Sequence, residues 1–154
     1  MTENTVRNII KTAIQREKDA HALYTSAADR VDAQHAKALL QDLAAQEAGH
    51  RNRLEGILAG DAFRKIDNAR QKQVEDLKIT DYLVEVPLDE DSDFQDILIV
   101  AGKREKASHD LYSSLAQVTD DEDVAEVFEF LAQEELTHKN RVETLYEEFV
   151  YKEN

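Results

Sequence analysis

The amino-acid sequence contains two copies of one pattern, separated by 88 residues. Self-similarity at a fixed offset indicates an internal duplication, so the two halves are expected to share one fold. The match continues without a gap and includes Glu17 and Glu105, His21 and His109, Tyr24 and Tyr112, Glu47 and Glu135, and His50 and His138.

Each copy predicts two helices joined by a short turn, because apolar residues recur at helical spacing. The sequence has only one Pro and four Gly, which favours long helices. The predicted helices are residues 4–29, 33–59, 94–118 and 122–150.

Residues that cap helices lie near these predicted ends. Asp32 and Asp120 occupy equivalent N-cap positions, and Ser92 with Gln95 forms a capping box before the third helix. Gly60 is a plausible C-terminal stop for the second helix.

The two copies are separated by a segment, residues 60–93, that is too long for a hairpin turn. Its apolar residues favour a short helix lying on the bundle, and Tyr82–Val84 is expected to be extended. A long crossover between the second and third helices is typical of ferritin-like bundles. The predicted fold is therefore an all-α, ferritin-like four-helix bundle over residues 1–154, one domain built from hairpins 4–59 and 94–151.

Charge and composition exclude several kinds of partner and cofactor. The net charge of -14 argues against binding to nucleic acid or to an anionic membrane surface. The longest uncharged apolar run, Ile97 to Gly102, is far shorter than the ~20 residues that a membrane helix needs. Without Cys, metal ligands must be His or carboxylate. We expect a soluble, cytoplasmic protein.

Two Glu-x-x-His motifs predict a metal site. Glu47 and His50 leave one face of a helix, and Glu135 and His138 repeat this arrangement. Glu17 and Glu47 are 30 residues apart, with the predicted turn at their midpoint, so both lie about 22 Å from that turn. Glu105 is related to Glu135 in the same way. Two packed hairpins would thus bring four carboxylates and two imidazoles to one level.

Four ionised carboxylates in a bundle core would cost several kcal/mol each without compensation. Two divalent cations would cancel this charge. The same ligand set occurs in ferritin-like di-iron and di-manganese proteins, so two iron ions are expected, with manganese or zinc as alternatives. The other interpretation is that these Glu and His face solvent and recur only because the hairpin was duplicated.

Tyrosine and the remaining histidines lie close to these motifs in sequence. Tyr24 and Tyr112 each follow the single Glu of their copy by two helical turns, so either could hydrogen-bond a ligand carboxylate. The alternative is a plain core tyrosine. We expect His21 and His109 at the edge or surface of the bundle, and His35 at the surface.

The sequence resembles the di-iron domain of the rubrerythrin family, through Arg-Glu-Lys…Tyr followed by Ala-Gln-Glu-x-x-His in the first half, with close counterparts in the second. The resemblance implies that Glu47 and Glu135 bridge two metals, whereas Glu17 and Glu105 are terminal ligands. It also implies that His50 and His138 each bind one metal and that Tyr24 and Tyr112 are hydrogen-bonding tyrosines near the centre.

The resemblance implies a non-haem di-iron oxidoreductase that reduces hydrogen peroxide or dioxygen. The sequence lacks a rubredoxin-type four-Cys domain, so the electrons are expected from an external donor such as a rubredoxin-like protein. The alternatives are ferritin-like oxidation and storage of iron, and a structural bundle that metals only stabilise. The sequence leaves the oligomeric state open, with a homodimer as one alternative.

Overall fold

The computed structural model describes residues 2–60 and 93–151. The helices are α1 (Thr2–Asp29), α2 (Gln34–Ala59), α4 (Phe94–Val118) and α5 (Glu122–Tyr146), and a π-helical turn, η3 (Glu147–Tyr151), extends α5. No strand occurs in the described ranges. The four predicted helices are confirmed, although the last one changes to π-helix after Tyr146. The predicted crossover, with its short helix and extended piece, lies outside the described residues.

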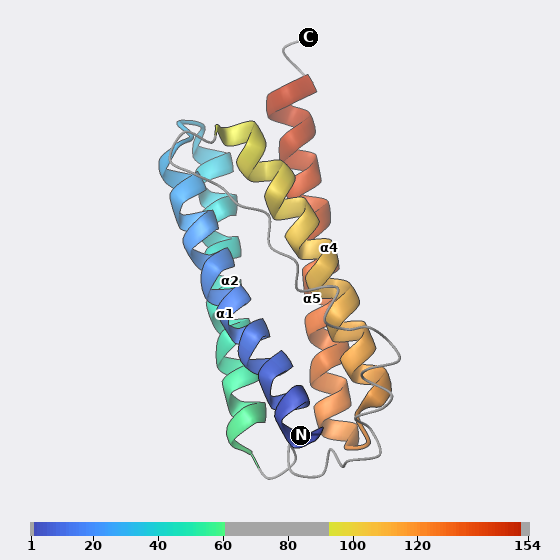
Figure 1. Ribbon diagram of the computed structural model, residues 1–154. Helices are drawn as coiled ribbons and strands as arrows, with labels where there is room; N and C mark the ends of the chain where they lie inside the picture. Colours follow the sequence, from blue (N-terminus) through green and yellow to red (C-terminus); the bar gives the residue numbers. More distant parts are fainter. Residues whose placement is uncertain (1, 61–92, 152–154) are drawn as a thin grey trace.

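The helices form two antiparallel pairs that pack into one bundle (Figure 1). The α1–α2 pair and the α4–α5 pair each pack closely. In Figure 1, α2 ends at the end of the bundle opposite to the one where α4 begins, so these two consecutive helices run in the same direction. This is the connectivity of a ferritin-like four-helix bundle, as predicted.

The core consists of two apolar clusters separated along the bundle by a layer of polar side chains. One cluster includes Ile10, Leu54 and Phe128, and the other includes Leu40, Leu43 and Leu98. The buried Glu and His residues lie between these clusters in the sequence of every helix. The apolar clusters on both sides therefore place the polar layer in the interior of the bundle.

The caps differ from the prediction in three of the four cases. Asp93 caps α4 by accepting from the Asp96 N–H, and Asp121, rather than Asp120, caps α5 by accepting from the Asp123 and Val124 N–H groups. Ser92 lies outside the described residues. Adjacent aspartates are equally good caps by sequence, and only the backbone geometry at the turn selects one of them.

The turn between α1 and α2 uses a different device. The N-cap of α2 is Ala33, not Asp32, and its side chain makes no capping hydrogen bond. Lys37 instead donates to the carbonyl oxygen of Ala28 at 2.6 Å, which satisfies an acceptor at the end of α1. At the other end of α2, Gly60 is the C-cap, as predicted, and its N–H donates to the Ile57 carbonyl.

Candidate metal centre

Six acidic and imidazole side chains form the polar layer in the middle of the bundle. Each of the four helices contributes to it, and every member is at most 3% exposed. The six residues are Glu17 of α1, Glu47 and His50 of α2, Glu105 of α4, and Glu135 and His138 of α5. The structure thus brings together all the residues that the sequence predicted as metal ligands, and the solvent-facing interpretation is wrong.

The closest contacts of the layer cross from one hairpin to the other. His50 Nδ1 lies 2.6 Å from a carboxylate oxygen of Glu135, and His138 Nδ1 lies 2.7 Å from one of Glu47. The two imidazole rings stack, with centroids 5.3 Å apart. One ligand atom from each of Glu47, His50, Glu135 and His138 can be chosen so that all four lie within 4.8 Å of one another. These atoms could converge on shared ions.

Several buried atoms of the layer have no hydrogen-bond partner among the described residues. They are Glu17 Oε2, Glu47 Oε1, both ring nitrogens of His50, Glu105 Oε2, both carboxylate oxygens of Glu135, and His138 Nδ1. Buried polar atoms are normally satisfied, because each one left alone costs about 1–3 kcal/mol. Carboxylate oxygens and imidazole nitrogens that converge in this way are a donor set typical of a metal centre. The residues therefore fit a pair of metal ions.

Burial and mutual repulsion perturb the two carboxyls of the Glu-x-x-His motifs. Burial raises the pKa of Glu47 well above its ordinary value, and the charges of Glu105 and Glu17 raise it further. The pKa of Glu135 is raised by the same causes. In the absence of cations the environment therefore shifts both groups towards the protonated form. A bound cation would reverse this preference by stabilising the carboxylates.

Both buried tyrosines donate a hydrogen bond to a carboxylate of the opposite hairpin. Tyr24 donates to Glu105 at 2.6 Å, and Tyr112 donates to Glu17 at 2.6 Å. Burial and the surrounding carboxylates raise the pKa of each phenol well above 10.0, so both keep their protons at neutral pH. Each tyrosine therefore holds one oxygen of a single Glu and leaves the other oxygen for a metal.

The three remaining histidines lie outside the layer, as expected. The exposed His21 contacts the Ala44 carbonyl through Nδ1 at 2.9 Å, and the half-buried His109 contacts Asp110. His35 is exposed, forms an ion pair with Glu148 and stacks on Phe149 of η3. None of the described helices is both long enough and apolar enough to cross a membrane.

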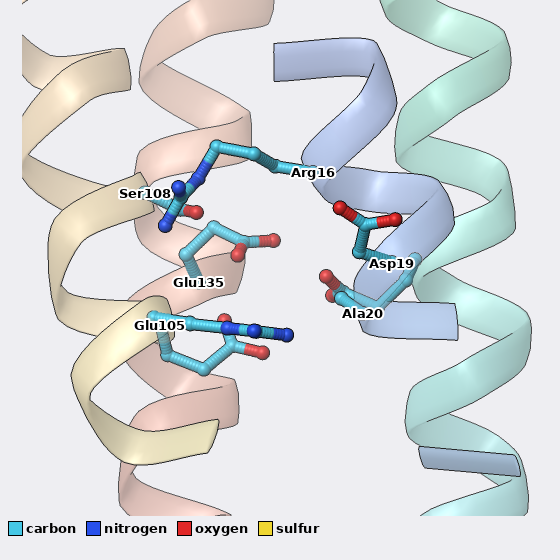
Figure 2. A pocket seen from close by; sticks show the side chains of 8 residues that line it. Arg16, Asp19, Ala20, Glu105, Ser108 and Glu135 are labelled. Atoms are coloured by element: carbon cyan, nitrogen blue, oxygen red, sulfur yellow. The ribbon is translucent and has the colours of Figure 1, made fainter. Parts of the chain in front are cut away.

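A small cavity between α1 and α4 reaches the layer from the side (Figure 2). Its volume is about 10 Å³, which is room for about one water molecule. The lining residues are Arg16, Asp19 and Ala20 of α1, Arg104, Glu105 and Ser108 of α4, and the ligand-motif carboxylates Glu47 and Glu135. Figure 2 shows Arg16 extending from α1 towards Ser108 on α4, across the cavity.

Sequence reasoning missed the residues around the ligands. The Nε2 atom of His138, which faces away from the layer, contacts Gln46. Arg16 and Arg104 line the cavity. Both arginines belong to the duplicated pattern. A search of the two copies for polar residues adjacent to the ligands would have found all three.

The fold and the layer together define a ferritin-like four-helix bundle with a carboxylate and histidine site for two metal ions. Comparison with families of known proteins matches residues 8–89 and 96–154 to rubrerythrin. The chain belongs to the rubrerythrin family. No curated protein and no solved structure matches it.

Proposed function

We propose that this chain is a non-haem di-iron oxidoreductase that reduces hydrogen peroxide, or dioxygen, with electrons from an external donor. The observation that carries the proposal is the buried layer of four Glu and two His, whose unpartnered oxygens and nitrogens fit two cations. Membership of the rubrerythrin family supports iron as the metal.

A pair of ferrous ions in this layer would supply two electrons. Reduction of one hydrogen peroxide takes these two electrons and two protons, breaks the O–O bond and yields two water molecules. The protein would neutralise and position the ions, since four carboxylates balance the charge of two divalent cations. Tyr24 and Tyr112 would fix the orientation of Glu105 and Glu17 through their hydrogen bonds.

The size of the cavity supports a small oxidant as the substrate. With room for about one water molecule, it could admit peroxide or dioxygen after a small displacement of its lining, but no organic substrate. Arg16 and Ser108 provide hydrogen-bond donors at this entry. Glu47 and Glu135 also line this cavity.

Electrons must then come from outside the described residues. No Cys is present in the chain, so these 154 residues cannot form a rubredoxin-type iron site. We propose a separate donor, such as a rubredoxin-like protein, that reduces the two ferric ions after each turnover.

The test is to compare two oxidants. Anaerobically prepared diferrous protein is mixed in a stopped-flow instrument with stoichiometric hydrogen peroxide or with dissolved dioxygen. We expect oxidation by peroxide to be much faster. Equal or faster oxidation by dioxygen, with continued consumption of added Fe(II), would favour the second candidate, ferritin-like oxidation of iron.

The third candidate is a structural bundle that metals stabilise. It predicts that the loaded centre reacts with neither oxidant. A mass measurement separates the second candidate further, because iron storage requires a shell of many subunits. A monomer or dimer in solution would therefore contradict storage.

A further inference from the structure

The two histidines of the layer differ in the hydrogen bonding of Nε2, the ring nitrogen that faces away from the layer. His138 Nε2 lies 2.7 Å from Gln46 Oε1, a hydrogen-bonding distance. His50 Nε2 has no hydrogen bond within the described residues, and Glu134 Oε1 lies 3.9 Å from it. Gln46 and Glu134 occupy equivalent positions in the two copies. The duplicated site is therefore asymmetric just outside its ligands.

A chain of polar contacts fixes the orientation of the Gln46 amide. Gln46 Nε2 donates to Asp42 Oδ2 at 2.8 Å, and Arg141 donates to the same oxygen at 3.0 Å. Because a carboxylate only accepts, the amide nitrogen must face Asp42, so the amide oxygen faces His138. His138 Nε2 must then carry the proton. Its Nδ1 is then the nitrogen that faces the carboxylates of the layer, where it could bind a metal ion.

The other copy replaces these hydrogen bonds with a cation–π contact. The counterpart of Asp42 is Phe130, and the counterpart of Arg141 is Arg53. The Arg53 guanidinium lies 4.6 Å from the centre of the Phe130 ring, a cation–π contact in which the phenylalanine offers no hydrogen-bonding group. Among the described residues, no hydrogen bond therefore holds the Nε2 atom of the His50 ring.

We propose that Gln46, held by Asp42 and Arg141, positions His138 so that the metal position at His138 is filled first and more tightly than the one at His50. The inference rests on the proposed metal centre but not on its oxidant. A preorganised imidazole loses less freedom on binding, and loss of such an outer partner typically weakens metal affinity about tenfold to a hundredfold. We expect the two binding steps to be separated by about this factor.

The test titrates the apo chain with Co(II) and follows visible absorption and heat. The matched variants are Gln46→Leu and Glu134→Leu, which make the same change of shape at equivalent positions. We expect Gln46→Leu to weaken the tighter step about tenfold to a hundredfold and Glu134→Leu to leave that step unchanged. In His50→Ala, the remaining ion should bind with the tighter constant of the wild-type chain.

A second pair of variants keeps the test decisive if Gln46→Leu fails to fold. Asp42 and Phe130 are both exposed, so their substitution should leave the fold intact. Asp42→Ala should weaken the tighter step, whereas Phe130→Ala should change neither step. Equal affinities of the two steps in the wild-type chain, or weakening of the tighter step by Glu134→Leu, would overturn this inference. Neither result would contradict the proposed metal centre. Absence of Co(II) binding would overturn it together with the metal centre and the proposed function.

Discussion

Without metal ions, mild acid should stabilise this protein instead of destabilising it. The pKa values of Glu47 and Glu135 are raised above their ordinary 4.5, chiefly by burial. Between 4.5 and the raised values, the folded apo chain holds protons that the unfolded chain releases. Stability from this source is complete below the unfolded pKa and is lost as the pH rises through the folded pKa. The apo chain should therefore become more stable as the pH falls from about 7.5 to about 5.5.

The size of the effect follows from proton linkage. Each proton bound only by the folded state changes the free energy of unfolding by about 1.4 kcal/mol per pH unit. Two carboxyls therefore contribute at most about 2.7 kcal/mol per pH unit, or about 5 kcal/mol over two units. For a chain of this size, 1 kcal/mol corresponds to roughly 2–4 °C in Tm, so the upper limit of the shift is about 10–20 °C.

The assay is thermal unfolding by circular dichroism, with and without chelator, across this pH range. The metal-loaded chain should show the opposite trend, because metal binding requires deprotonated ligands and weakens in acid. At neutral pH it should melt well above the apo chain, since ions at a hundred times their Kd add about 2.7 kcal/mol. The control is Glu47→Gln with Glu135→Gln, which should flatten the pH dependence of the apo chain. An apo Tm that is constant or falls towards pH 5.5 would refute the reasoning.

Further predictions concern single residues of the layer. Glu47→Ala or Glu135→Ala should remove both ions if these carboxylates bridge, as counted by metal analysis of the purified variant, and retention of one ion would refute bridging. His50→Ala or His138→Ala should instead weaken mainly one ion, measured in the same way. Tyr24→Phe should leave two ions bound but change the rate of oxidation by peroxide in stopped-flow traces, whereas an empty site would show that the phenol is needed for assembly.

The level of the site along the bundle could be predicted because it depends only on distances along the helices. Glu17 and Glu47 lie equally far from their turn, and the duplication repeats that spacing, so the ligands meet wherever the hairpins pack in register. The helical secondary structure could be predicted equally well, because apolar residues at helical spacing over more than 20 residues leave little ambiguity.

The partners of individual side chains could not be predicted. Whether Tyr24 reaches the Glu of its own hairpin or Glu105 of the other depends on the packing of the two hairpins, which no local pattern encodes. The capping error at Asp120 has a local cause, since Asp121 has the same side chain and the backbone of the turn decides between them. Gln46 was visible in the motif, but its role required the position of Asp42 and Arg141 in space.

The contacts in the layer run between the two hairpins, so metal binding and the assembly of the bundle should depend on each other. Tyr24 and Tyr112 donate to carboxylates of the opposite hairpin, and each motif histidine lies closest to the Glu of the opposite motif. The close helix pairs, by contrast, lie within the hairpins. Each hairpin alone therefore carries half of the layer, with two carboxylates and one imidazole. Cations shared across the layer would neutralise carboxylates of both hairpins at once, so metal binding should strengthen the packing of the two halves against each other.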